Sequence, residues 1–367
     1  MKKNILVTGC GGAPTTNFIR SLRDADSKNE RYFIVGIDYD KYTLHRSECD
    51  RSYLCPSAKD EAYIGYLVEI IRRENIGFLH TQPEVEVYVV GRQRGVIART
   101  GCRLLMPRQE TIELLRDKFL SYEVWARAGI AVPRNIKINT VDDLKRAFAE
   151  FGKNIWVRET IGAAGKGSLS SPTYELAKSW IDMRSGWGNT VAAEHLTNRT
   201  TTWQSLWENG KLVVGQGRER LYWEAANRAQ SGVTGITGTG KIVKDASLAE
   251  LAMQCIRAAD TAPHGIFSVD FTYDRHDVPN PTEINIGKFF TTHHFITRAG
   301  CNMPEIMVQL AFGEYRGPYD VINPCKEDLY WVRGVDVRPV MLSENEIAVK
   351  VRERDEILKG IKHDPVA

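Results

Sequence analysis

The sequence predicts an α/β protein that begins with an open parallel sheet. Residues 1 to about 107 alternate short apolar segments with segments of helical periodicity, a pattern typical of βαβ units. Farther along the chain, Asn209-Gly210 separates two apolar segments, which indicates an antiparallel hairpin. With 367 residues, of which 43% are hydrophobic and 26% charged, we expect a globular protein of two or three folding units.

The N-terminal elements predict a sheet of parallel strands joined by helices. Apolar, β-branched segments predict strands, and longer segments of helical periodicity predict the helices between them. We expect strands at 4–8, 32–38 and 76–81, and helices at 16–23 and 63–74. This order is that of a Rossmann-like parallel sheet.

The glycine turn at residues 9–13 admits two interpretations. With Asp38 at the end of the next strand as a ribose ligand, it would bind a nicotinamide dinucleotide. However, the G-x-G-x-x-G spacing is incomplete, because Gly12 is followed by Ala13-Pro14. We favour a structural turn that needs positive φ angles. We expect it to face a substrate cleft together with residues near Glu84, at the carboxyl ends of the strands.

The composition argues against several classes of protein. The formal net charge of +3 is too close to balance to indicate a nucleic-acid or membrane partner. No apolar run approaches the roughly 18 residues that a membrane span needs, and the run after Lys3 is too short for a signal peptide. The seven cysteines are scattered without a C-x-x-C pair, which favours reduced thiols and a cytoplasmic location.

Two acidic segments near the C-terminal end predict a metal site. Residues 265–271 alternate apolar and polar side chains, residues 274–281 are rich in turn formers, and 282–285 return as a second strand. Because residues two apart on a strand share a face, Asp270, Glu283 and Asn285 are expected to lie together. Carboxylate and amide oxygens suit Mg²⁺. The alternative is a hairpin with a solvated polar face.

The middle of the chain predicts further helices and strands around a glycine loop. Gly129 and Pro133 mark the end of a helix that begins near Asp117. We expect further helices at 142–151, 248–259 and 304–313, and strands at 155–158, 190–196, 203–207 and 211–215. The loop at 162–168 could wrap phosphates with its exposed amides or be a mobile surface hairpin.

Taken in order, these segments resemble the ATP-grasp superfamily, in particular the group related to carbamoyl phosphate synthetase and small carboxylate–amine ligases. Five motifs carry the resemblance. The first two are Asp117-Lys118 together with residues 129–133, and Val157-Arg158 together with the loop at 162–168. The others are residues 193–196, Asp270 together with residues 283–285, and residues 299–304. The resemblance implies an N-terminal pre-ATP-grasp domain followed by an ATP-grasp fold with a glycine-loop lid. The implied domains are 1–107, 108–320 with a lid subdomain at about 131–195, and an appended element at 321–367.

The resemblance also implies roles for individual residues, each of which could instead be structural. Lys118 and Arg158 would neutralise nucleotide phosphates, although Arg158 stands where such ligases usually have a lysine. The glycine loop would close over the phosphates, and 194–196 would read the adenine. The implied nucleotide-binding residues are Lys118, Arg158, Gly165, Lys166, Gly167, Ser168, Glu194, His195 and Leu196, and the implied metal ligands are Asp270, Glu283 and Asn285.

The sequence departs from the family pattern at several positions. Residues 200–204 contain no carboxylate for the ribose, and Gly287 stands where many relatives have an arginine aimed at the acyl phosphate. Lys288 is a candidate replacement, and we take Arg158, Lys288 and Arg298 as the catalytic set. Arg218 and Arg220 are further candidates for gripping a carboxylate or phosphate. For His293-His294, which we place on a strand, we expect polar lining of a substrate pocket rather than a metal site.

These observations predict a ligase that uses ATP with Mg²⁺ or Mn²⁺. It would activate a small-molecule carboxylate as an acyl phosphate and join it to an amine, releasing ADP and phosphate. A homodimer is possible. One alternative is a non-catalytic, regulatory nucleotide-binding protein with the same fold. A second, disfavoured by the incomplete glycine motif, is an NAD-dependent oxidoreductase. The identity of the acid and the amine stays open.

Overall fold

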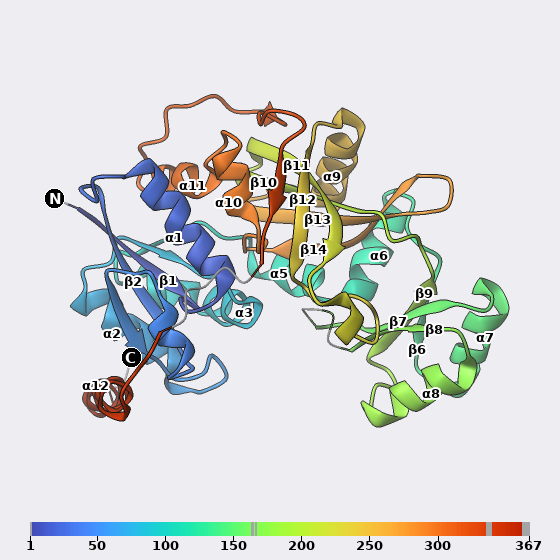
Figure 1. Cartoon of the computed structure of the whole chain (residues 1–367), viewed down its shortest axis with the longest axis horizontal. Coiled ribbons are helices and arrows are strands. Elements are labelled where there is room, and N and C mark those ends of the chain that lie inside the picture. Colours follow the sequence, from blue (N-terminus) through green and yellow to red (C-terminus); the bar gives the residue numbers. More distant parts are fainter. Residues whose placement is uncertain (1, 163–164, 166, 335–339, 362–367) are drawn as a thin grey trace.

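The computed structural model describes residues 2–162, 165, 167–334 and 340–361. Three sheets form the framework, and Figure 1 shows them side by side along the longest axis of the molecule. None of the helices in the described ranges is long and apolar enough to cross a membrane.

The N-terminal sheet has five parallel strands in the order β3-β2-β1-β4-β5. This confirms the predicted parallel sheet. Its strands are β1 (Lys3–Thr8), β2 (Tyr32–Asp38), β3 (Arg51–Leu54), β4 (Phe78–His80) and β5 (Arg103–Leu104). The connecting helices are α1 (Ala13–Ala25), η1 (Thr43–Arg46), α2 (Ala62–Arg73), α3 (Glu84–Arg92) and α4 (Arg94–Ala98). The carboxyl ends of β1 and β4 lie side by side and lead into the glycine turn and into Glu84.

The central sheet has seven strands and carries most of the polar residues discussed below. The order is β14-β13-β10-β11-β12-β16, and β15 pairs with β11. Its strands are β10 (Thr200–Glu208), β11 (Lys211–Trp223), β12 (Thr237–Val243), β13 (Gly265–Tyr273), β14 (Pro279–Ile286), β15 (Val321–Ile322) and β16 (Tyr330–Val332), and the short η2 (Ala226–Arg228) follows β11. The predicted Asn209-Gly210 hairpin joins β10 to β11, and both turn residues have positive φ.

Helices cover the central sheet on both sides. One group, α5 (Gln109–Arg116), α6 (Lys118–Arg127) and α9 (Ala246–Ala259), packs together against β13 and β14. Two others, α10 (His293–Arg298) and α11 (Met303–Ala311), contact α1 of the N-terminal unit. The buried core continues from one unit into the other, since Leu6 and Tyr66 belong to the same cluster as Trp203 and Phe267. The N-terminal and central sheets therefore share one hydrophobic core.

A third, four-stranded antiparallel sheet forms a separate lobe at the right of Figure 1. It consists of β6 (Asn135–Ile138), β7 (Ile155–Glu159), β8 (Ser168–Ser171) and β9 (Thr190–Glu194), with the helices α7 (Val141–Phe151) and α8 (Tyr174–Met183). Its small apolar core, which includes Leu144, Val157 and Ile181, is its own. The glycine loop connects β7 to β8 in this lobe.

The C-terminal segment contacts two units. β15 and β16 extend the central sheet, whereas the last helix, α12 (Glu344–Ile361), packs against α2 and β3 of the N-terminal unit. Ile357 is buried there, and Lys350 Nζ donates a hydrogen bond to the carbonyl of Ser52 at 2.7 Å. The segment that we predicted as an appended element thus contacts both the central sheet and the N-terminal unit.

The cap of α6 gives a first testable prediction. The Asp117 carboxylate accepts hydrogen bonds from the amides of Phe119 at 2.9 Å and Leu120 at 3.2 Å. We expect Asp117→Ala to lower the free energy of unfolding by about 1 kcal/mol, because two amides of the first turn lose their acceptor. Urea denaturation measures this. Asp117→Asn keeps an acceptor and should stay close to wild type; an equal loss in both variants would contradict the cap.

Glu86 on α3 gives a second prediction. Its side chain is 3% exposed beside the hydroxyls of Thr8 and Tyr63, and burial raises its pKa to about 8. The unfolded chain releases this proton near pH 4.3. The folded state therefore binds more protons between these two values, so the stability contribution of Glu86 falls as pH rises from about 4.3 to 8.

We expect Glu86→Gln to remove this decline and to stabilise the protein at pH 8. The size should be a few kcal/mol, since each pKa unit corresponds to about 1.4 kcal/mol. Urea denaturation at pH 5 and pH 8 measures it, with the exposed Glu110→Gln as control. An equal pH dependence in Glu86→Gln and wild type would contradict the prediction.

Candidate active site

Four polar side chains form one row across the central sheet. The strand register places Arg218 of β11 opposite Thr202 of β10, Thr202 opposite Asp270 of β13, and Asp270 opposite Glu283 of β14. Asn285 lies two residues along β14 from Glu283, on the same face. Its side-chain amide donates to Asp270 Oδ2 at 2.9 Å. The structure thus brings Asp270, Glu283 and Asn285 together, in the antiparallel arrangement that the sequence predicts.

Two cations from different elements lie beside Glu283. Lys118 Nζ is 3.6 Å from Glu283 Oε2, and Arg158 Nη1 is 3.7 Å from the same oxygen. Arg158 is held in place by hydrogen bonds to the hydroxyl of Tyr122 at 2.6 Å and the carbonyl of Thr282 at 2.5 Å. Lys118 also donates to the carbonyl of Gly162, at the start of the glycine loop, at 2.7 Å.

Burial and charge act in opposite directions on the two carboxylates. Burial acts to raise the pKa of Glu283, but the surrounding cations, Lys118 and Arg158 foremost, hold it below its ordinary value. Burial raises the pKa of Asp270, although Arg220 opposes this shift. The positive charge near the half-buried Asp270 is therefore too small to offset desolvation, and a cation bound between the two carboxylates would favour the ionised form of both.

The donor set fits Mg²⁺. No group of three or more histidine, cysteine or acidic side chains that could hold a metal occurs in the described residues. The set at β13 and β14 consists instead of two carboxylates and an amide, which together supply only oxygen ligands. Mg²⁺ prefers oxygen, and it usually binds one or two carboxylates together with substrate phosphates and water.

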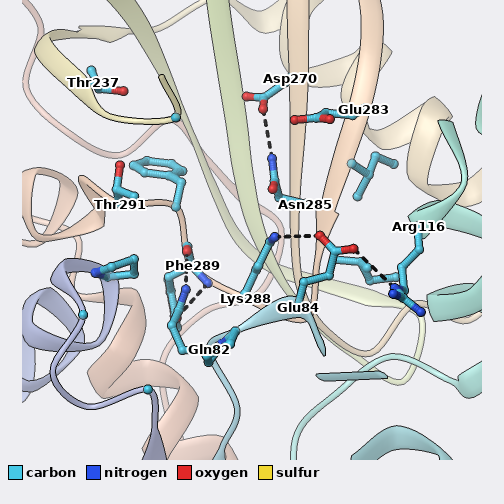
Figure 2. A pocket seen from close by; sticks show the side chains of 18 of the residues that line it. Gln82, Glu84, Arg116, Thr237, Asp270, Glu283, Asn285, Lys288, Phe289 and Thr291 are labelled. Atoms are coloured by element: carbon cyan, nitrogen blue, oxygen red, sulfur yellow. Dashed lines mark hydrogen bonds and ion pairs between the residues drawn. The ribbon is translucent and has the colours of Figure 1, made fainter. Parts of the chain in front are cut away.

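These residues line a cavity of about 400 Å³ between the N-terminal unit and the central sheet. Figure 2 shows the labelled carboxylates Asp270 and Glu283 on one side of it and Gln82 and Glu84 on the other. Gly9 and Gly12 of the glycine turn also line the cavity. This confirms the expectation that the turn and the residues near Glu84 face the cleft.

The glycine turn itself is closed by Asp38. The Asp38 carboxylate accepts hydrogen bonds from the amides of Gly11 and Asp40, both at 3.0 Å, and from the hydroxyl of Thr43 at 3.1 Å. Gly9 has a φ of 58°, as expected of a turn that needs a positive φ. Asp38 is thus engaged within the turn, which favours the structural interpretation over a ribose-binding one.

The N-terminal side of the cavity is joined to the segment after β14 by ion pairs and by one amide. Glu84 pairs with Lys288 Nζ at 3.1 Å and with Arg116 Nε at 3.3 Å (Figure 2). The Gln82 side chain donates to the carbonyl of Phe289 at 2.7 Å and accepts from its amide at 3.3 Å. Sequence reasoning missed Gln82 and Arg116, because neither belongs to a motif.

Several predicted site residues lie outside the cavity. Arg298 is 61% exposed and pairs with Asp24 at 3.5 Å on α1. Glu194 pairs with Arg134 at 3.0 Å, and neither it nor the adjacent His195 or Leu196 lines the cavity. Gly165, Gly167 and Ser168 border the start of β8, and Lys166 lies outside the described residues.

The prediction for the histidine pair is wrong. His293 and His294 begin helix α10 rather than lying on a strand, and neither lines the cavity. His293 is buried, and its Nδ1 lies 2.9 Å from the carbonyl of Phe290. His294 Nε2 lies 2.9 Å from Asp24. The pair helps to join α10 to its neighbours.

Comparisons with known proteins identify the fold. No family model matches the chain. The carbamoyl phosphate synthase large chain of Hyperthermus butylicus is 31% identical over 134 residues, which are 33% of this chain and 12% of that protein. The match therefore spans only a small part of that relative.

Among solved structures, the biotin carboxylase domain of 2-oxoglutarate carboxylase from Hydrogenobacter thermophilus, a dimer with MgADP, ADP and bicarbonate, matches with a TM-score of 0.66. It is 16% identical, and 90% of this chain and 73% of that chain are covered. N5-carboxyaminoimidazole synthetase from Staphylococcus aureus, complexed with ADP, matches with a TM-score of 0.65 at 17% identity, and the match covers 86% of this chain and 79% of that chain. L-amino acid ligase from Bacillus licheniformis matches with a TM-score of 0.63 at 12% identity, and the match covers 86% of this chain and 76% of that chain.

The chain has the ATP-grasp fold. The separate lobe that carries the glycine loop corresponds to the segment for which the resemblance implies a lid, and the central sheet carries the predicted metal ligands. At these identities the likeness establishes the fold, and the reaction rests on the residues of the site.

We expect Glu283→Gln to leave the fold intact and to reduce Mg²⁺-dependent turnover of the nucleotide strongly. Turnover should fall by two to three orders of magnitude or more, roughly the loss from removing one charge-stabilising group. ADP release and calorimetric titration with MgATP measure it. Glu219→Gln is the control, since Glu219 lies on β11 and pairs with Arg199 at 3.2 Å. Near-normal turnover in Glu283→Gln would remove Glu283 from the site.

Proposed function

We propose that this protein is an ATP- and Mg²⁺-dependent ligase that activates a small carboxylic acid as an acyl phosphate and joins it to an amine. The observation that carries the proposal is the juxtaposition of Asp270, Glu283 and Asn285 with Lys118 in a cavity of an ATP-grasp fold, with Arg158 beside Glu283. This is the arrangement of oxygen ligands and cations that phosphoryl transfer needs. Bound at the carboxylates, Mg²⁺ would neutralise the phosphate oxygens of ATP.

The first step transfers the γ-phosphoryl group to the acid. An oxygen of the substrate carboxylate forms a bond to the γ-phosphorus as the bond between that phosphorus and the β,γ-bridging oxygen breaks, and ADP leaves with the electron pair. Lys118 and Arg158 would stabilise the charge that this transfer spreads over the phosphate oxygens. Both cations are already held beside Glu283, so little reorganisation is needed at the moment of reaction.

The second step forms the amide. The amine nitrogen attacks the carbonyl carbon of the acyl phosphate, the bond from that carbon to the phosphate oxygen breaks, and phosphate leaves while the nitrogen gives up a proton. Gln82 and Glu84 of the N-terminal unit border the cavity opposite Asp270 and Glu283, and we place the amine on this side. The solved L-amino acid ligase of the same fold supports this class of reaction.

A regulatory protein without catalysis is the alternative. It requires nucleotide binding but not a complete metal set, and the structure brings all three predicted oxygen ligands together. Acid-dependent release of ADP would separate the two functions. The acids to be screened against amines should include bicarbonate, which is bound in the solved biotin carboxylase domain.

An acyl phosphate intermediate is the mechanistic prediction. Once an acid is found, hydroxylamine in place of the amine should yield a hydroxamate, with ADP formed in equal amount, because the acyl phosphate reacts with any strong nucleophile. Colorimetric hydroxamate detection and nucleotide chromatography measure both products. Glu283→Gln should form neither. AMP and pyrophosphate in place of ADP would overturn the mechanism and leave the fold untouched.

A further inference from the structure

Two arginines on β11 are buried against the cavity. Arg218 is 1% exposed and Arg220 is 9% exposed, and both line the cavity. They lie two residues apart on the strand, so their side chains leave the same face of the sheet. Aromatic rings cover them: the guanidinium carbon of Arg218 is 4.6 Å from the ring centre of Phe290, and that of Arg220 is 3.6 Å from Trp223.

Hydroxyl groups, rather than carboxylates, hold these arginines. Arg218 donates to Thr237 at 2.8 Å, to Thr202 at 2.7 Å and to Thr292 at 3.4 Å. Arg220 donates to Thr237 at 3.1 Å and to Thr200 at 2.9 Å. These contacts orient the guanidinium groups but supply no negative charge.

The positive charge is therefore poorly compensated. No carboxylate of the described residues forms an ion pair with Arg218, and its buried Nε has no hydrogen-bond acceptor there. Arg220 has a long pair with Asp270, at 3.9 Å. Burial, and in Arg218 also the neighbouring Arg220, lowers the pKa of these side chains. A buried charge without a partner destabilises a fold, so its presence indicates a bound anion.

The arginine that the family pattern places after Asn285 would be strained in this chain, which has Gly287 there. Gly287 has a φ of 69°, and a Cβ at this position would lie 2.6 Å from Cγ1 of Val87. Lys288, the next residue, is directed to Glu84. Positive charge for an acyl phosphate must therefore come from elsewhere in the cavity.

The arginines flank the metal ligands on the side away from Lys118 and Arg158. In the sheet order β14-β13-β10-β11, Glu283 with its two cations is at one end of the polar row and Arg218 is at the other. Figure 2 shows Thr237, which accepts from both arginines, on the side of the cavity away from Glu84 and Arg116. In-line transfer needs the donor and the acceptor on opposite sides of the γ-phosphorus.

We propose that Arg218 and Arg220 form the anion subsite that holds the carboxylate of the acid substrate and the acyl phosphate made from it. This inference rests on the proposed function, because it assigns the acceptor side of the same transfer. A small, compact anion is the expected ligand, since the guanidinium groups are fixed by hydroxyls and enclosed by Phe290 and Trp223.

The experiment uses phosphonoformate as the probe, because it joins a carboxylate to a phosphonate and cannot be hydrolysed like an acyl phosphate. Calorimetry with the full-length protein first measures MgADP binding and then phosphonoformate binding in the presence of MgADP. Arg218→Met and Arg220→Met should weaken phosphonoformate binding by roughly 30-fold or more, the loss expected when a buried charged partner is removed. MgADP binding should stay within about threefold, a change of less than 1 kcal/mol.

Arg199→Met is the matched control. Arg199 lies just before β10, and it pairs with the carboxylates of Glu219 and Asp277 outside the cavity. The Arg199→Met variant should bind phosphonoformate as tightly as the wild-type protein does. Melting temperature separates a binding role from a structural one: Arg218→Met should melt no lower than wild type, since it removes a buried charge without a carboxylate partner. If Arg218→Met does not fold, phosphonoformate binding by Arg220→Met tests the proposal.

The outcomes distinguish the two proposals. Wild-type protein that binds MgADP but not phosphonoformate, or arginine variants that bind phosphonoformate normally, would overturn the anion subsite and leave the proposed function standing. Arginine variants that lose MgADP and phosphonoformate alike would also overturn the subsite. Wild-type protein that binds no magnesium nucleotide would overturn the proposed function itself.

Discussion

The partial burial of the Asp270 carboxylate, whose side chain is 18% exposed, is the constraint on which the site depends. A buried carboxylate is costly unless neighbouring groups satisfy its oxygens. Here the partners are the hydroxyl of Thr202, the amide of Asn285 and, more distantly, Arg220, each from a strand beside β13 or one strand farther. Strand register therefore determines the site, because a slip of one residue would turn each side chain to the other face. The Asn209-Gly210 turn, which sets the register of β10 against β11, contributes to the site without touching it.

A second constraint is the docking of the N-terminal unit onto the end of β14. Gln82 pairs with both backbone groups of Phe289, and Glu84 pairs with Lys288, so the segment after β14 is held from across the cavity. The two units also share a hydrophobic core. The cavity is therefore formed by two packed units, and ligand sites often occur at such interfaces. Motion is expected chiefly from the separate lobe that carries the glycine loop, which has its own core.

The features that could be predicted from the sequence are those with local causes. Alternation along two strands predicts that Asp270, Glu283 and Asn285 share a face, and the glycine turn and the hairpin follow from backbone preferences at single residues. The role of Gln82 depends on a contact with Phe289, 207 residues away in the chain, and no local pattern indicates it. Arg298 directly precedes the segment 299–304 that resembles the family, but it lies at the end of helix α10, where it pairs with Asp24. The histidine pair was misplaced because Thr292 precedes a helix rather than continuing β14.

The departure at Gly287 connects these constraints. Helix α3 brings Val87 so close to the end of β14 that a side chain at position 287 would force Val87 to move, and the positive φ there also favours glycine. The close contact between Val87 of the N-terminal unit and Gly287 therefore disfavours an arginine two residues after Asn285. In the same cavity, β11 carries two buried arginines that no carboxylate fully compensates. Under the proposed function, the positive charge for an acyl phosphate would come from a strand instead of the loop after β14, and threonine hydroxyls fix it in place. Such a preorganised site stabilises developing charge without having to rearrange. The same fixed geometry limits which acids fit, so substrate choice in this chain should depend on β11 as much as on the N-terminal wall.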